Sequence, residues 1–407
     1  MSTTHSHITF CPGCGLALNL DQPGHGESCF CPRCQTRLVK GKMLRFNTEI
    51  ALSLACLTLF VPVLFMPLLT ITLFGVKIPA TLPDGALQLM LNGFPFVGAL
   101  SMFCGVVAPV LYVITVLLTH LGLAMKVKRL FASGVRTLAF LKHWVMIDVY
   151  LISLAISCFK VRDYADIEFG IALYALIACQ ILLIILLSRT SIHRYWEQWQ
   201  SVPKFTVLLP ETLIQCHHCL AVQSQGKSHC HRCNQTLSHR QPQSLQRTWA
   251  YLIAATVFLL PANYYPISIL ITNGSRLEDT IFSGVLSLIN SDMILIAIII
   301  FTASILVPVA KIAILAFLLV SIHKQSKQGY KKRMALHRIV QWIGKWSIMD
   351  LFVISIMMTL LDRGQILDFT PGIGAIAFGI VVVLTMLAAE SLDSRLLWDN
   401  YDNEQPT

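Results

Sequence analysis

The chain has 407 residues, of which 55% are hydrophobic and only 13% are charged, and its formal net charge is +10. Its mean hydropathy is strongly positive, at +0.66. This balance excludes an ordinary soluble domain and is typical of a protein that crosses a membrane several times. The short alternating segments of a membrane β-barrel are absent, so the membrane segments are expected to be helices.

Two Cys-x-x-Cys pairs lie within residues 1–46, the first predicted domain. Their cysteines are Cys11, Cys14, Cys31 and Cys34. Each pair can form a tight knuckle, and two knuckles together supply four thiolates in tetrahedral geometry, as in a zinc ribbon. A closed four-sulfur site has no open coordination position, so the zinc is expected to be structural. No cleavable signal peptide is expected, and the first span would serve as an uncleaved anchor.

Four apolar segments fill the second predicted domain, residues 47–190. A bilayer-spanning helix needs about 20 apolar residues, and the segments that meet or nearly meet this length are Ile50–Phe74, Phe94–Thr119, Leu141–Phe159 and Phe169–Ser188. The third is the weakest, because Asp148 lies near its middle. The sequence therefore predicts a four-helix membrane module.

A second cysteine module occupies residues 191–243. Its ligand set is Cys216, Cys219, Cys230 and Cys233, which predicts a second zinc ion. Other nearby side chains could replace a ligand, namely Cys29, His217, His218, His229 and His231. Redox or iron chemistry is an alternative, although no βαβ pattern surrounds either module, and a module that binds no metal is another. Cysteines inside the spans are expected only to pack, namely Cys56, Cys104, Cys158 and Cys179.

Four more apolar segments fill residues 244–398, before a tail at 399–407. They are Trp249–Thr272, Met293–Ile322, Trp346–Leu361 and Ile373–Ala389. The two halves repeat each other, since LKHWVMIDVYLISL (141–154) matches IGKWSIMDLFVISI (343–356) and Pro109 matches Pro308. The expected fold is an all-α polytopic membrane protein with two parallel repeats. Each repeat is a small zinc ribbon followed by four transmembrane helices, eight in total.

Basic residues cluster in the same loop of each repeat. The first loop contains Lys126, Lys128 and Arg129, and the second contains Lys331, Lys332 and Arg333. By the positive-inside rule both loops are cytoplasmic, which also places both ribbons and both termini there. Structural disulfides are rare in that compartment, which favours zinc. The positive charge is thus mainly a topology signal, and nucleic-acid binding by 331–333 is the less favoured alternative.

Lys311 is the most unusual residue of the membrane segments, because it lies inside VPVAKIAILAFLLVSI (307–322). A charge at mid-bilayer costs about 2.5–3.5 kcal/mol on insertion scales, so a partner is expected. Asp350, in the seventh span, is the predicted partner. The pair is either a clamp between two spans or a site that handles protons or lipid headgroups, since buried Lys and Asp can titrate near neutrality.

Further polar residues are expected beside this pair. Ser304 shares a helix face with Lys311, Ser347 shares one with Asp350, and Thr385 lies at a similar depth. In the first repeat Tyr112 stands where the second has Lys311, so Asp148 has no basic counterpart and is a weaker candidate.

Long motifs resemble the paraquat-inducible protein A (PqiA) family, and within it the LetA branch. They are PANYYPISI, GSRLEDTIFSG, ASILVP-x-x-K, W-x-G-x-W-S-x-x-D-L-F-V-I-S and ESLDSRLLWD. The resemblance implies an inner-membrane protein of double-membraned bacteria. It also implies a partner with MCE domains that forms a tunnel across the periplasm and carries phospholipids or other lipids.

The leading functional hypothesis is therefore a component of lipid transport. The phosphate-binding motif GxxxxGK[ST] is absent, so energy would come from an ion gradient or from another protein. An enzyme acting on lipid headgroups is not expected, because no Ser-His or paired-carboxylate constellation is evident. A zinc- or redox-responsive stress protein and a membrane scaffold without its own transport activity are the remaining alternatives.

Overall fold

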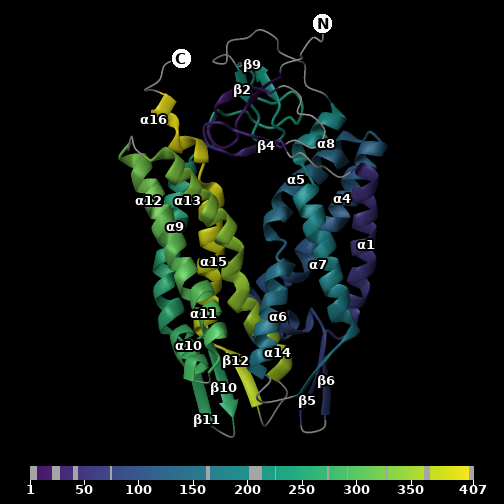
Figure 1. Cartoon of the computed structure of the whole chain (residues 1–407), viewed down its shortest axis with the longest axis vertical. Coiled ribbons are helices and arrows are strands. Elements are labelled where there is room, and N and C mark those ends of the chain that lie inside the picture. Colours follow the sequence, from purple (N-terminus) through teal and green to yellow (C-terminus); the bar gives the residue numbers. More distant parts are fainter. Residues whose placement is uncertain are drawn as a thin grey trace.

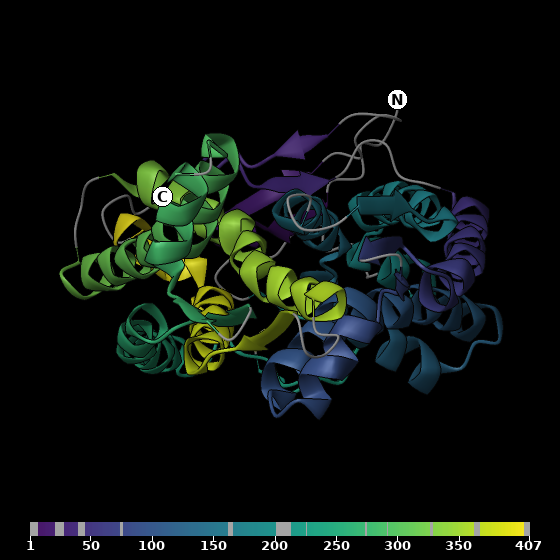
Figure 2. The ribbon, with the colours of Figure 1, turned by 90° about the horizontal axis from the view of Figure 1, so that it is seen from below.

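The computed structural model describes residues 7–20, 28–39, 45–73, 76–161, 166–200, 213–224, 226–272, 275–290, 292–325, 329–361 and 367–402. Two bundles of long helices stand side by side (Figures 1 and 2), and each bundle is formed by one half of the chain. The cysteine modules lie at one end, called here the ribbon end, and short sheets lie at the other, called the sheet end.

The first half runs through one series of elements after the ribbon. They are α1 (Phe46–Phe65), β5 (Leu69–Leu73), β6 (Val76–Ala80), α2 (Asp84–Leu91), α3 (Pro95–Met102), the π-helix η1 (Phe103–Val107), α4 (Ala108–Ala124), α5 (Lys128–Trp144), α6 (Ile147–Val161), β7 (Asp166–Phe169), α7 (Ile171–Arg189) and α8 (Ile192–Trp199).

The second half repeats this series nearly element by element. It contains α9 (Ser244–Tyr264), β10 (Ser268–Thr272), β11 (Ser275–Asp279), α10 (Ile281–Asn290), α11 (Ile294–Phe301), the π-helix η3 (Thr302–Leu306), α12 (Val307–His323), α13 (Tyr330–Ile343), the 3₁₀-helix η4 (Gly344–Ile348), α14 (Met349–Leu361), β12 (Leu367–Pro371), α15 (Ile373–Ser391), η5 (Ser394–Leu397) and α16 (Asp399–Asp402). The matching π-helices confirm the predicted duplication.

Seven segments of the described chain are long and apolar enough to cross a membrane. They are Phe46–Phe65, Pro95–Ala124, Lys128–Phe159, Ile171–Arg189, Ile294–His323, Tyr330–Leu360 and Ile373–Ser391. Helix α9 is 21 residues long but begins with polar residues, and it packs along α15. With α9 the structure has the eight long helical segments that the sequence predicts.

The ends of the first and fifth predicted spans are strands, which the sequence did not predict. Helix α1 stops at Phe65 and α9 at Tyr264, and the residues that follow turn into β5 and β10. Pro67 and Pro266 explain the stop, because a proline lacks the N–H for a helical bond and favours an extended residue before it. Met66 and Tyr265 are indeed extended, with ψ of 153° and 150°.

Each half closes at the sheet end with a three-stranded antiparallel sheet, in the orders β6-β5-β7 and β11-β10-β12. In both sheets a glycine directly follows the last strand, where the chain passes close to an earlier backbone segment. A Cβ on Gly170 would lie 2.0 Å from the carbonyl oxygen of Pro67, and a Cβ on Gly372 would lie 2.0 Å from that of Pro266. Only glycine allows this close approach, so the two sheets share one construction.

The third and seventh spans are longer than predicted, and both are interrupted. They extend over Lys128–Phe159 and Tyr330–Leu360. The first is interrupted between α5 and α6, and the second by η4 between α13 and α14. The predicted spans Leu141–Phe159 and Trp346–Leu361 cover only the parts nearer the sheet end. The two halves meet there through α6 and α14, where Ser153 Oγ donates to the carbonyl oxygen of Met349 at 3.0 Å.

Candidate metal centres and the buried polar cluster

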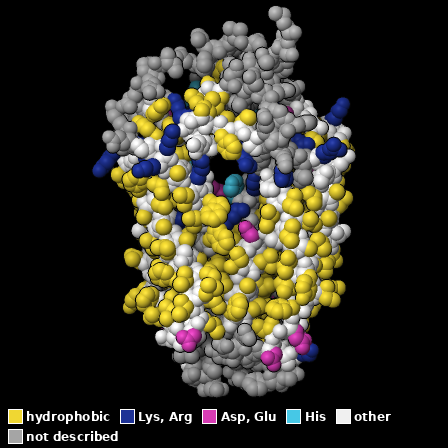
Figure 3. Space-filling view, in the orientation of Figure 1, with side chains coloured by type: hydrophobic (Ala, Val, Ile, Leu, Met, Phe, Trp, Pro, Cys, Tyr) yellow, Lys and Arg dark blue, Asp and Glu magenta, His cyan; other side chains and the backbone are white. Residues whose placement is uncertain are grey.

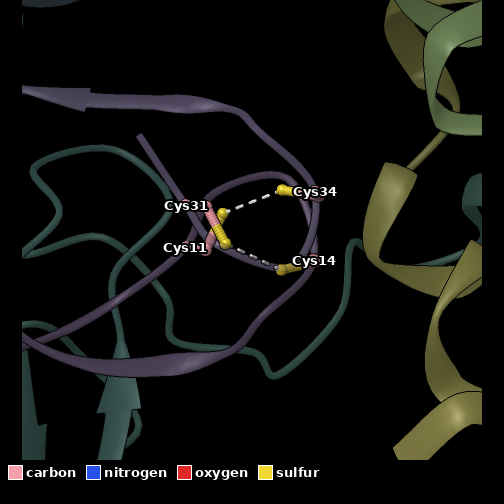
Figure 4. A group of neighbouring side chains, drawn as sticks. All are labelled: Cys11, Cys14, Cys31 and Cys34. Atoms are coloured by element: carbon pink, nitrogen blue, oxygen red, sulfur yellow. Dashed lines mark hydrogen bonds between the residues drawn. The ribbon is translucent and has the colours of Figure 1, made fainter. Parts of the chain in front are cut away.

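The first ribbon brings its four predicted cysteines together. It is built on two hairpins, β1 (His7–Phe10) with β2 (Ala17–Leu20) and β3 (Cys29–Phe30) with β4 (Arg37–Val39). The four buried sulfurs point toward one another (Figure 4) and lie within 4.8 Å of one another. Each knuckle is closed by an N–H that donates to the first cysteine of its pair, from Gly15 to Cys11 at 2.9 Å and from Gln35 to Cys31 at 2.8 Å.

The second ribbon repeats this geometry with Cys216, Cys219, Cys230 and Cys233. It includes the hairpin of β8 (Leu213–Gln215) and β9 (Val222–Ser224). Its Sγ–Sγ contacts are 3.5 Å and 3.6 Å, against 3.4 Å and 3.6 Å in the first ribbon. Leu220 and Asn234 close the knuckles with positive φ, as Gly15 and Gln35 do. Both predicted quartets therefore form.

The alternate ligands that the sequence offered lie outside the two quartets. Cys29 is part of β3, His217 Nε2 lies 3.0 Å from the carbonyl oxygen of Ser238, and His231 Nδ1 lies 2.6 Å from Gln223 Oε1. None of the cysteines forms a disulfide.

The chemistry of the quartets fits a metal ion. Contact with Cys14 lowers the pKa of the Cys11 thiol to about 5, and contact with Cys11 raises the pKa of Cys14. Four adjacent thiols cannot all ionise unless a cation offsets their charge, because each thiolate opposes the next. A dication that favours sulfur resolves this conflict, so each quartet can hold one metal ion in a closed site.

The first ribbon docks on the second half of the membrane domain. Arg338 of α13 donates hydrogen bonds to the carbonyl oxygens of Cys34 and, at 3.4 Å, Gln35. The guanidinium of Arg33 lies 5.7 Å from the ring centroid of Trp398 and 4.6 Å from that of Tyr401. The first ribbon, which precedes the first half in the chain, therefore packs against the second half.

The second ribbon docks on the first half through equivalent residues. Arg136 of α5 donates to the carbonyl oxygen of Cys233 at 3.3 Å, and the buried guanidinium of Arg232 lies 5.7 Å from the ring centroid of Trp196. Arg136 and Trp196 occupy the positions of Arg338 and Trp398 in the repeat. Sequence reasoning missed this exchange of ribbons, although the repeated Arg and Trp were a visible signal.

Lys311 is almost fully buried, with 2% of its surface exposed. Its Nζ donates to the carbonyl oxygen of Gly344 at 3.2 Å. Gly344 begins η4, so the ammonium of span six contacts the interruption in span seven. The predicted ion pair between Lys311 and Asp350 stays a prediction, with Asp350 in the first turn of α14, just beyond η4.

The elements that carry the other predicted polar residues also meet at η4. Ser304 lies on η3, which contacts η4, and Thr385 lies on α15, which packs against η4. Ser347 belongs to η4 itself. The Oγ atoms of Ser304 and Ser347 are buried and have no hydrogen-bond partner within the described chain, whereas Thr385 Oγ1 donates to Val382. Two unpartnered buried hydroxyls therefore lie on elements that meet where Lys311 binds Gly344, and these residues are called here the polar cluster.

The first repeat has a different arrangement at the corresponding depth. Tyr112 is buried and Asp148 is half-buried in the first turn of α6. A buried acid that sequence reasoning missed lies nearer the ribbon end, where Glu49 accepts from Tyr195 Oη at 2.7 Å. Its carboxylate also lies 3.4 Å from Arg194 Nη1 and 3.6 Å from His120 Nε2.

The architecture defines a class of protein: a duplicated four-helix membrane module in which each repeat begins with a four-cysteine ribbon. The family model of "Paraquat-inducible protein A" matches residues 46–200 and again 245–402, once for each repeat. The chain belongs to this family.

Three relatives match nearly its whole length. It is 39% identical to the "Lipophilic envelope-spanning tunnel protein A" of Escherichia coli K12 over 97% of the chain and 91% of the relative. It is 34% identical to a "Probable intermembrane transport protein" of Haemophilus influenzae over 98% and 97%, and 28% identical to the E. coli "Intermembrane transport protein PqiA" over 97% and 95%. No solved structure matches the chain.

Proposed function

We propose that this protein is the inner-membrane component of a system that moves phospholipid between two membranes, and that it exchanges lipid with a periplasm-spanning MCE-domain tunnel. The names of its relatives, which describe intermembrane transport and an envelope-spanning tunnel, support this role. They also favour a transport component over an enzyme. Zinc is the proposed metal of both quartets, in a structural role.

The ribbon end is proposed to face the cytoplasm and the sheet end the periplasm. Lys and Arg side chains gather near the ribbon end, whereas Asp and Glu appear toward the sheet end (Figure 3). This asymmetry supports the orientation expected from the positive-inside rule. Both termini would then be cytoplasmic.

Reporter fusions test this orientation. A fusion after Leu91, at the end of α2, is expected to be active as a periplasmic alkaline phosphatase. A fusion after Ser133, within α5, is expected to be inactive as a phosphatase and fluorescent as a cytoplasmic green fluorescent protein. The opposite result at either position would contradict the proposed orientation.

The observation that carries the functional proposal is the contact of Lys311 with the carbonyl oxygen of Gly344 at an interrupted span. A buried ammonium is stable only while it is partnered, so its protonation state is coupled to the position of η4. Loss of the proton removes a charge-assisted hydrogen bond and frees η4 to move relative to α12. This coupling gives an ion gradient a route to move η4, which also contacts α6 of the first half.

Lipid transfer between vesicles tests the proposal. The full-length protein is reconstituted in vesicles with a fluorescent phospholipid, together with its MCE partner, and transfer to acceptor vesicles is measured with and without a pH gradient. Transfer is expected to depend on the protein and to rise with the gradient. Lys311→Met should abolish the gradient-dependent part, whereas Tyr112→Phe, at the equivalent position of the other repeat, should retain it. Equal transfer by protein-free vesicles would refute the proposed function.

A further inference from the structure

A hollow lies between the two halves of the molecule, near the ribbon end. Figure 3 shows it as an opening in which Lys or Arg, His, and Asp or Glu side chains gather, while hydrophobic side chains cover the surface below it. The halves are joined through α6 and α14 toward the sheet end and through the exchanged ribbons at the other end. The hollow therefore lies between these two contact regions and is open at the side of the molecule.

Two lysines, one from each half, lie on segments between these two contact regions. Lys142 lies near the end of α5 and Lys345 lies in η4, and both are half-buried. Helix α6, which follows Lys142 in the chain, contacts η4 directly, and the positive charge of Lys345 acts on Lys142. Within the described residues neither ammonium has a hydrogen bond or an ion pair. Like charges held together in a partly desolvated place are unfavourable unless an anion lies between them.

An acid of the second half also lies beside α5, but it already has a partner. Glu390 of α15 reaches across to the first half, where its Oε1 lies 4.0 Å from His143 Nδ1. The acid is thus engaged with the residue that follows Lys142 in the chain. The two ammonium groups can therefore bind one external anion, and Glu390, beside His143, can contact a cationic substituent on that ligand.

Exposed aromatic side chains indicate the depth of the lysines in the membrane. Phe140 and Trp342 occupy equivalent positions in the two repeats, a short distance before Lys142 and Lys345. They are 55% and 72% exposed. Tryptophan side chains such as Trp342 gather where the acyl chains meet the headgroups. The lysine pair accordingly lies a short distance on the membrane side of this boundary, where Gly344, the residue before Lys345, binds Lys311.

We propose that Lys142 and Lys345 bind the phosphodiester of a phospholipid headgroup that enters the hollow from the cytoplasmic leaflet. The proposal rests on the proposed function, since it names where lipid is taken up or released. Each ammonium supplies three donors to phosphate oxygens. A free phosphate ion offers the same oxygens, but the lipid fits better because its acyl chains cover the apolar surface beside the hollow.

A binding titration tests the site directly. Purified full-length protein in detergent is titrated with dioctanoylphosphatidylethanolamine, and in a separate arm with inorganic phosphate, while tryptophan fluorescence reports on Trp144 and Trp346 beside the lysines. Replacing both lysines, Lys142→Met with Lys345→Met, is expected to weaken lipid binding by about tenfold for each charge lost. Lys142→Arg with Lys345→Arg should largely retain binding. The control Lys331→Met with Lys332→Met removes two exposed charges of α13 and should leave binding unchanged.

Unchanged lipid affinity in the double Met variant would overturn the inference, as would inorganic phosphate binding as tightly as the lipid. The outcome can be separated from that of the proposed function. Vesicle transfer that persists in the wild-type protein while the double Met variant binds lipid normally refutes only the headgroup site. Lysine-dependent binding without any transfer supports the site and refutes transport.

Discussion

Replacing Cys14 by Ser is expected to remove one of two zinc ions per chain and to unfold the first ribbon. Cys14 is one of four mutually close sulfurs, and structural zinc sites of this kind contribute about 10–16 kcal/mol of folding free energy. This loss of folding free energy is far larger than the remaining contacts of two short hairpins could offset. Metal analysis of the purified protein measures the zinc, and hydrogen exchange measures the ribbon.

Because each ribbon docks on the other half of the chain, the structure predicts which helices each cysteine variant destabilises. Because the first ribbon contacts Arg338 of α13 and Tyr401 of α16, Cys14→Ser should increase exchange in α13 and α16 of the second half. Cys219→Ser should instead affect α5 and α8 of the first half, which hold the second ribbon. Each variant is thus expected to increase hydrogen exchange in the half that belongs to the other repeat.

Cys29→Ser is the matched control, since Cys29 lies in the same ribbon but outside the quartet. It should retain both zinc ions and normal exchange. Well under one zinc per wild-type chain, with no metal lost during purification, would contradict the assignment of zinc. Increased exchange confined to the half that follows each ribbon in the chain would contradict the exchanged docking.

Lys311→Met combined with Asp350→Leu is expected to restore protein level without restoring lipid transport. Removing one member of a buried charge pair costs about 3–5 kcal/mol unless the remaining group becomes neutral. Either single change is therefore expected to lower activity, with a smaller effect on protein level. The double change removes both charges and leaves apolar side chains of similar size in the buried cluster, so packing recovers.

The activity of the double variant distinguishes a structural contact between spans six and seven, called here a clamp, from a proton-handling pair. A clamp needs only the contact between spans six and seven, so the double variant would regain envelope integrity together with stability. A proton-handling pair needs the titrating groups, so the double variant would be stable and inactive. Protein level and lipid-dependent envelope integrity are measured for both single variants and the double variant, with Tyr112→Phe as the control. Full activity of the double variant would reduce Lys311 to a packing role.

Local patterns in the sequence were sufficient for several features of this protein. The Cys-x-x-Cys spacing predicted both quartets, because a knuckle is formed by neighbouring residues. Long apolar runs predicted the membrane helices, because the bilayer sets a minimum length for them. The duplication followed from matched segments such as 141–154 and 343–356.

Features that depend on distant contacts were decided only by the tertiary structure. The strand β5 belongs to an apolar run that continues α1, and its pairing with β7 was not visible without the fold. The exchange of ribbons joins Arg338 to Cys34, 304 residues earlier in the chain. His143 and Glu390 likewise become neighbours only when the two halves pack. Periodicity and spacing report which surfaces a segment can bury, whereas the partner of each surface is chosen by packing and charge between segments far apart in the chain.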